Sequence, residues 1–174
     1  MSTLKISTTF FVLFAFLFSC NPNKQKIADD PVLSTEEKLQ DRFINKQLES
    51  VNTILFNGKA MVEKKILLIY TGFDCQSCVD KGYLILKTIR SHNENQQIYI
   101  IATNANIGMD QDRNEYYDFI YNDSQELIRK ELKFIYTPVI LVLDRDNRII
   151  HLNFPETHSN EHEMTEHINH AISK

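Results

Sequence analysis

Continuous apolar runs alternate along this chain with stretches in which apolar residues recur every three or four positions. The runs ILLIY, IYIIA and VILVL have the length and the β-branched content of strands buried on both faces of a sheet. A further stretch returns antiparallel to VILVL after the polar turn DRDN, since asparagine tolerates the positive φ that such turns need. The pattern predicts strands over residues 66–70, 98–102, 139–143 and 148–154, with shorter ones over 53–56, before an Asn57–Gly58 turn, and within 116–121.

Helical spacing of apolar residues predicts four helices between and around these strands. Their expected bounds are about 34–50, 79–89, 124–132 and 161–172. Ser34 stands three residues before Glu37, which is the spacing of a capping box, and Ser124 is expected to cap the third helix. Strands that alternate with helices and end in a hairpin and a helix predict one α/β domain.

The first twenty residues have the pattern of a targeting segment. The apolar run Phe10–Phe18 is shorter than the roughly twenty residues that span a bilayer, and it suits the core of a signal peptide. It ends in Leu17-Phe18-Ser19-Cys20, which resembles the lipobox of bacterial lipoproteins. That resemblance implies acylation of Cys20, cleavage before it, and a lipid-anchored protein facing the bacterial periplasm. The alternative is an ordinary cleaved signal in which the cysteine stands by chance.

The chain is therefore expected to have three parts. Residues 1–19 are the predicted signal peptide, and residues 20–33 are a polar, proline-containing tether that begins at the lipidated cysteine. Residues 34–174 form the predicted folded domain.

Composition and charge exclude several classes of function. The formal net charge is −4, so the chain lacks the basic surface expected of a nucleic-acid-binding protein. Its 43% hydrophobic content is that of an ordinary globular protein, and three cysteines cannot build a disulfide framework. The fold must therefore depend on a hydrophobic core, and the cysteines need another explanation.

Two of the cysteines form the motif Cys75-Gln76-Ser77-Cys78, directly after a buried strand and at the start of a helix. Helical geometry there brings both sulfurs close enough to bond. The first sulfur meets the N–H groups and the positive dipole end of the helix, which favour a thiolate. Cys75 is then the nucleophile and Cys78 resolves the mixed disulfide. A zinc half-site and a purely structural disulfide are the alternatives, although no second Cys or His pair completes a zinc site at a compact spacing.

At this point the chain resembles the thioredoxin-fold family, and especially its extracytoplasmic, membrane-anchored thiol–disulfide oxidoreductases. Three segments carry the resemblance: KKILLIYTGFDCQSC, the residues Tyr136-Thr137-Pro138-Val139, and LVLDRDNRII. The family would make this a thioredoxin-like domain, with a central mixed sheet flanked by helices. It would also make Pro138 a cis-proline and place Thr137 and Pro138 beside the sulfurs, where they dock the substrate chain. A trans proline that starts an edge strand is the alternative.

The resemblance implies thiol–disulfide exchange with extracytoplasmic protein substrates, carried out by a monomer without a dissociable cofactor. The rival hypothesis is a non-catalytic thioredoxin-fold binding module in which Cys75 and Cys78 form a structural disulfide.

Five residues depart from the family pattern. Asp74 stands where an aromatic residue is frequent, and Gln76-Ser77 replaces the commoner Gly-Pro or Pro-Pro pair. Ile69 and Lys81 stand where relatives often have an acidic residue. Asp74 could cap the helix, and its charge should oppose the effect of the helix dipole on Cys75.

The remaining candidate residues are assigned no chemistry. His158, His162, His167 and His170 have spacings that could bind a metal, but such residues more often form a solvated polar face, so no metal is predicted. Nothing in the sequence places His151 near the cysteines. Tyr116, Tyr117 and Phe119 are expected to pack in the core.

Overall fold

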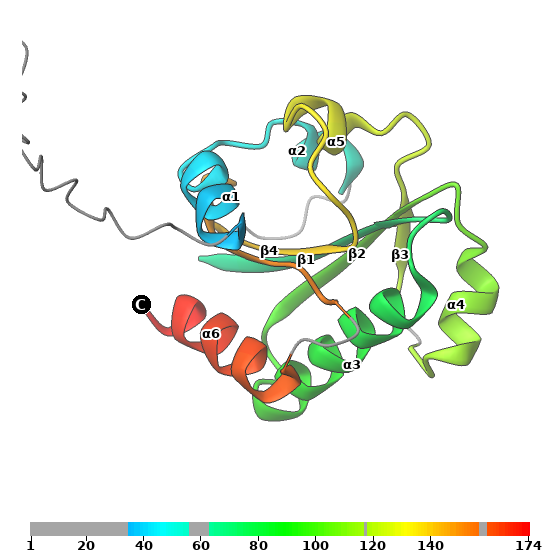
Figure 1. Cartoon of the computed structure of the whole chain (residues 1–174). Coiled ribbons are helices and arrows are strands. Elements are labelled where there is room, and N and C mark those ends of the chain that lie inside the picture. Colours follow the sequence, from blue (N-terminus) through cyan, green and yellow to red (C-terminus); the bar gives the residue numbers. More distant parts are fainter. Residues whose placement is uncertain (1–34, 56–62, 117, 157–159) are drawn as a thin grey trace, which may run out of the picture. The chain divides into compact units, whose positions relative to one another are not determined.

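The fold is built around a five-stranded sheet with the strand order β3-β2-β1-β4-β5 (Figure 1). This computed structural model describes residues 35–55, 63–116, 118–156 and 160–174, within one compact unit that spans residues 33–174. The predicted signal peptide, the tether, Cys20 and the Asn57–Gly58 turn lie outside the described residues. The strands are β1 (Lys64–Thr71), β2 (Gln97–Thr103), β3 (Ile120–Asn122), β4 (Val139–Asp144) and β5 (Ile149–Asn153).

The sheet is mixed, as predicted. Strand β1 pairs parallel with β2 and antiparallel with β4, while β3 and β5 form the two edges. The three central strands are the three continuous apolar runs of the sequence. They can be apolar throughout because the sheet has a hydrophobic core on each of its faces.

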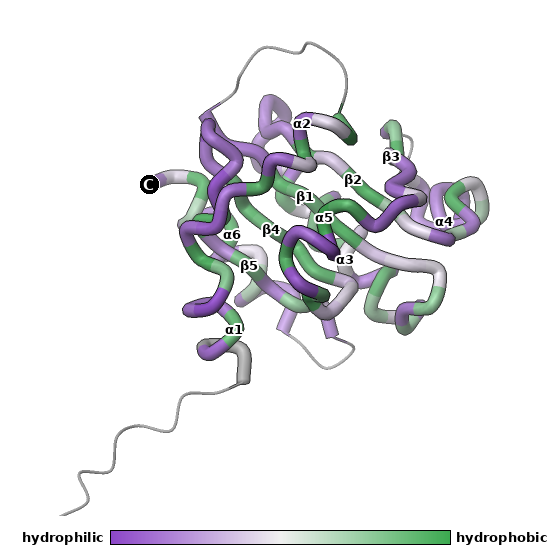
Figure 2. Tube along the Cα trace, turned by 90° about the horizontal axis from the view of Figure 1, so that it is seen from above, coloured by the Kyte–Doolittle hydropathy of each residue, from purple (hydrophilic) through white to green (hydrophobic). Residues whose placement is uncertain are grey.

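Helices cover both faces of the sheet. Side chains alternate along β1, so Leu68 and Tyr70 face one core, whereas Leu67 and Ile69 face the other. Helices α3 (Gln76–His92) and α6 (Glu161–Ser173) lie on one face, and α1 (Thr35–Phe43), α2 (Ser50–Ile54) and α5 (Leu127–Glu131) lie on the other (Figure 1). Hydrophobic stretches gather along the strands of the sheet (Figure 2).

The predicted helix over 34–50 is interrupted in the structure. Helix α1 ends at Phe43, and the next residues pair with the β4–β5 hairpin instead: Asn45 N–H donates to the Ile149 carbonyl at 2.8 Å, and Leu48 N–H donates to that of Asn147 at 3.0 Å. The prediction of a strand over 53–56 was wrong for its first two residues, because Thr53 and Ile54 belong to α2.

Three further details differ from the prediction. Helix α4 (Ile107–Arg113) follows β2 and was not expected. The N-cap residue of α5 is Glu126 rather than Ser124, and the carboxylate of Asp123 accepts the Leu127 N–H at 2.9 Å and the Ile128 N–H at 3.2 Å. Tyr116 is buried as expected, but Phe119 is 71% exposed, and Tyr117 lies outside the described residues.

Gly82 lets helix α3 pack tightly on the sheet. A Cβ atom at this position would lie 2.9 Å from Cδ1 of the buried Leu68. Among the described residues, no helix combines the length and the apolar composition needed to cross a membrane.

Candidate active site

The chain turns sharply between the end of β1 and the start of α3. Gly72 N–H donates to the Thr103 carbonyl at 2.8 Å, and a Cβ atom on Gly72 would lie only 1.9 Å from the Asn104 carbonyl oxygen. Only glycine allows the loop after β2 to approach this closely. The turn fixes the position from which Cys75 leaves the sheet.

Cys75 is the N-cap residue of α3, and Cys78 lies in the first turn of that helix. The carbonyl of Cys75 accepts the N–H groups of Cys78 and Val79, each at 3.0 Å. Its Sγ lies 3.1 Å from Oγ of Ser77. Cys75 is exposed and Cys78 is half-buried, so an incoming sulfur reaches Cys75 more easily. The N-terminal end of a helix stabilises a thiolate through its N–H groups and its dipole.

Asp74 does not cap α3 as the sequence had suggested. Its carboxylate accepts the backbone N–H of Thr71 at 2.7 Å and the Thr71 hydroxyl at 3.1 Å. It also accepts the hydroxyl of Thr137 at 2.8 Å, across 63 positions of sequence. Asp74 therefore ties the loop that carries the cysteines to the loop that precedes β4.

The Thr137–Pro138 peptide bond is cis, which confirms the expectation from the resemblance. The antiparallel register pairs Ile69 near the end of β1 with Val139 at the start of β4. This pairing brings the Thr137–Pro138 loop to the end of the sheet from which the Cys75 turn leaves. The hydrogen bond from Thr137 to Asp74 then fixes the two loops side by side.

A buried polar cluster that the sequence did not reveal lies beside the motif. Asp110 of α4 is 7% exposed, and its carboxylate accepts hydrogen bonds from the Tyr70 hydroxyl at 3.2 Å and from Arg113 at 2.6 Å. The Gln76 amide donates to Asp110 at 3.5 Å and to Asp80 at 3.0 Å. The side chain of Gln76, which follows Cys75 in the motif, is thus anchored to α4. Because α4 itself was not predicted, no sequence signal connected Asp110 with the motif.

Two tyrosines complete this cluster beneath the motif. The hydroxyls of Tyr70 and Tyr83 are 3.1 Å apart. Burial, followed by the hydrogen bond to Tyr83, raises the pKa of Tyr70, and burial raises the pKa of Tyr83 to about 12. Both phenols therefore stay protonated at any physiological pH and act as hydrogen-bond donors.

Large apolar side chains are exposed on both loops of the site. Phe73, two residues before Cys75, is 88% exposed, and Tyr136, directly before Thr137, is 69% exposed. Exposed aromatic groups that flank one site are typical of surfaces that contact another protein.

The C-terminal histidines do not form a metal centre in the part of the chain that the structure describes. No group of three His, Cys, Asp or Glu side chains there could hold a metal ion. His158 lies outside the described residues, whereas His162 is 3.6 Å from Glu166, one turn along α6. His151 faces His167, with ring centroids 6.4 Å apart.

Comparison with known proteins identifies the fold. No family model matches the chain, and no curated protein matches it in sequence. A secreted disulfide oxidoreductase of Mycobacterium tuberculosis, homologous to E. coli DsbE, superposes with a TM-score of 0.51 at 16% identity, over 62% of this chain and 81% of that one. A Chlorobium tepidum protein assigned as thiol:disulfide interchange protein DsbE gives 0.52 at 9% identity, over 64% and 82%.

A third solved structure, the thioredoxin-like superfamily protein SPOA0173, gives a TM-score of 0.50 at 10% identity, over 66% of this chain and 82% of that one. The chain therefore has a thioredoxin-like fold, as the resemblance predicted.

Proposed function

We propose that this protein exchanges a dithiol and a disulfide with protein substrates through Cys75 and Cys78. The observation that carries the proposal is the placement of the pair: an exposed Cys75 at the N-cap of α3, and a half-buried Cys78 one turn later. The thioredoxin-like fold supports it, because solved structures of that fold include disulfide oxidoreductases.

The reaction runs in two exchanges. The Cys75 thiolate attacks one sulfur of a substrate disulfide, the substrate S–S bond breaks, and the displaced substrate thiolate takes up a proton. Cys78 then loses its proton and attacks the Cys75 sulfur of the mixed disulfide. This step forms the Cys75–Cys78 disulfide and releases the second substrate thiol. Two electrons pass from the protein to the substrate, and the same steps in reverse oxidise a substrate dithiol.

The loop at Thr137 and Pro138 is the proposed docking site for the substrate chain. It lies beside the turn before Cys75 because Thr137 donates its hydroxyl to Asp74 at 2.8 Å. The exposed rings of Phe73, on the loop before Cys75, and of Tyr136, directly before Thr137, offer apolar contacts. Backbone groups of an extended segment can pair with such a loop much as an added strand pairs with a sheet edge.

Lipid anchoring in the bacterial envelope is the second part of the proposal. It rests on the apolar run that ends at the lipobox-like Leu17–Cys20. We expect Cys20→Ser to move the protein from the membrane fraction to the soluble fraction of the cell envelope, because the acyl chains supply the anchor. An unchanged membrane fraction would show that the cysteine carries no anchor.

A trapping experiment tests the exchange reaction. In Cys78→Ser the resolving thiol is absent, so mixed disulfides between Cys75 and substrates should accumulate in cells and appear on non-reducing gels. The matched variant Cys75→Ser removes the proposed nucleophile and should give no adducts. Adducts from Cys75→Ser alone would reverse the assignment of roles, and adducts from neither variant would favour a structural disulfide.

A further inference from the structure

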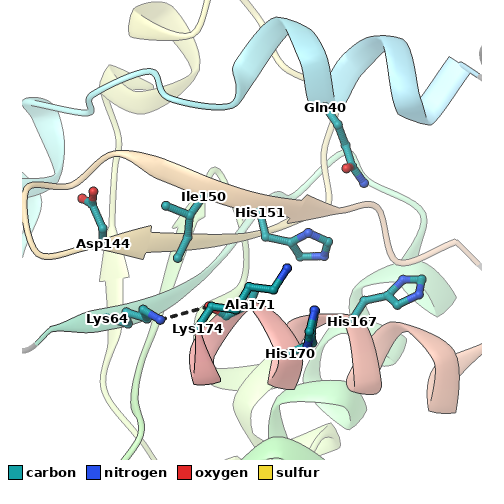
Figure 3. Close-up of a pocket in the computed structure, with 9 residues that line it drawn as sticks. All are labelled: Gln40, Lys64, Asp144, Ile150, His151, His167, His170, Ala171 and Lys174. Carbon is teal, nitrogen blue, oxygen red and sulfur yellow. Dashed lines mark hydrogen bonds between the residues drawn. The ribbon is translucent and has the colours of Figure 1, made fainter.

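A cavity of about 560 Å³ opens between the start of β1, strand β5 and the C-terminal half of α6 (Figure 3). Five of its nine lining residues are basic although the chain as a whole has a net charge of −4. They come from three separate elements: Lys64 from β1, His151 from β5, and His167, His170 and Lys174 from α6 and the residue after it.

The side-chain carboxylate and the helix carbonyls at this cavity already have partners. Asp144 is the one acidic lining residue, and its carboxylate accepts the backbone N–H groups of Asp146 at 2.9 Å and Arg148 at 2.8 Å. The carbonyls that end α6 carry the negative end of its dipole. The Lys64 ammonium covers them, donating to Ala171 at 3.2 Å and to Ile172 at 2.8 Å.

The basic groups retain donors that a ligand can use. An ammonium has three N–H groups, and the two hydrogen bonds of Lys64 to the end of α6 leave the third as a donor for a ligand. Lys174, His167 and His170 are exposed at its rim. His151 is held in place by a 2.5 Å hydrogen bond between its Nε2 and the Asn153 side-chain oxygen.

We propose that this cavity binds a tetrahedral oxyanion of the phosphate class, with Lys64, Lys174 and the imidazoles of His167 and His170 as its donors. Charged donors from separate elements converge there, and charge-assisted hydrogen bonds to phosphate oxygens are about twice as strong as neutral ones. A transition-metal ion suits the cavity less well, since two ammonium groups line it and no three ligands are arranged to hold a metal among the described residues.

Binding depends on pH in a direction that the structure fixes. Burial, and then the neighbouring His167, lower the pKa of His151, while its bond to Asn153 acts in the opposite sense. The ammonium groups of Lys64 and Lys174 and the imidazole of His170 face the same cavity, and Asp144 supplies its one side-chain carboxylate. An anion offsets this crowding of positive charge, so binding raises the pKa values of the imidazoles. Affinity should therefore increase as the pH falls from about 7.5 to about 5.5.

The site is separate from the cysteine motif. Lys64 pairs with Asp144 at the start of β1, whereas the turn to Cys75 leaves the other end of that strand. Eight residues at about 3.3 Å each put the two sites roughly 25 Å apart. The inference therefore stands or fails independently of thiol–disulfide exchange.

The test follows the Cε1–H resonances of the histidines by NMR through a pH titration of the full chain without an added histidine tag. Sulfate is the probe, because it stays a dianion over the whole range, and chloride at matched ionic strength is the reference. We expect sulfate to raise the midpoints of His151 and His167 by at least about half a unit. His167→Gln and Lys174→Gln should weaken sulfate binding several-fold. His162→Gln is the matched control, since His162 lies on the same helix but does not line the cavity.

Two vesicle types identify the source of the oxyanion. A His167-dependent shift with free sulfate supports a soluble ligand, and one seen only with phosphatidylglycerol vesicles, not phosphatidylcholine, supports a lipid phosphate. Equal shifts in sulfate and chloride together with no response to phosphatidylglycerol vesicles, or sulfate binding unchanged in both variants, would overturn the proposal. Zinc binding that requires His151 and His167, without any effect of sulfate, would also overturn it in favour of a metal site.

Discussion

The carboxylate of Asp74 joins the two loops that make up the candidate active site. It accepts hydrogen bonds from Thr71 on its own loop and from Thr137 on the other. It also places a negative charge next to the N-cap of α3, where the helix dipole favours a thiolate on Cys75. The same side chain thus holds the proposed docking loop in place, and we expect its charge to oppose thiolate formation on Cys75.

Replacing Asp74 by Asn removes the charge from a side chain of nearly the same shape. Its one carbonyl oxygen can still accept the Thr71 and Thr137 hydroxyls, whereas its NH2 group cannot accept the Thr71 N–H. We expect the pH at which Cys75 becomes reactive toward iodoacetamide to fall by up to about one unit, because the repulsion between carboxylate and thiolate is lost. The measurement is the alkylation rate of Cys75 across pH, read by mass spectrometry.

Asp146→Asn is the matched control for this charge. Asp146 is exposed in the β4–β5 turn, at the end of the sheet opposite to Cys75. Its replacement should leave the alkylation profile unchanged. A profile that does not move in Asp74→Asn, or that moves equally in Asp146→Asn, would show that Asp74 does not act on Cys75 through its charge.

At the scale of elements, the site depends on the close approach of the turn after β1 to the loop after β2. Gly72 makes that approach possible, since an added Cβ would lie 1.9 Å from a backbone oxygen of Asn104. Backbone atoms cannot rotate away from such a contact as a side chain can.

Gly72→Ala should therefore cost about 1–3 kcal/mol of unfolding free energy, as overpacked contacts do. Gly108→Ala is the matched control, because nothing lies within 4 Å of its added Cβ, and neither glycine has a positive φ. In helix α4 the control should be neutral or gain up to about 1 kcal/mol. Urea unfolding of both variants measures the difference, and equal stabilities would contradict the role given to Gly72.

The local pattern of apolar residues was enough to predict some helices and strands but not others. The central strands β1, β2 and β4 were predicted because a strand buried on both faces is apolar at every position. The first helix was predicted too long, because Asn45 to Leu48 pair with the β4–β5 hairpin, which is distant in sequence. Helix α4 was missed because its residues, IGMDQDR, bury little apolar surface: Met109 is 64% exposed.

Some features of the candidate site could likewise be predicted from the sequence, and others could not. The order of Cys75 and Cys78 at a strand-to-helix junction could be predicted, since it depends on neighbouring residues only. The cis bond before Pro138 followed from the resemblance to a family. The partners of Asp74 and Asp110 could not be predicted, because they are set by how separate loops meet in the folded chain.

At the scale of the whole molecule, the sheet separates two sites of different chemistry. One end carries the cysteine motif, the Thr137–Pro138 loop and exposed aromatic rings. The other end carries a basic cavity between β1, β5 and α6. The same rigid sheet supports both, so a substitution at one end should leave the other unchanged.

The reduction potential of the Cys75–Cys78 pair tests the central proposal most directly. The full chain is equilibrated in thiol–disulfide buffers of known potential, and the oxidised fraction is read after alkylation. Structural disulfides have potentials below about −300 mV, whereas exchange-active pairs lie above that value. We expect the pair to titrate as a two-electron couple above about −300 mV. A potential below about −300 mV would contradict an exchange function and favour a static disulfide in a binding module.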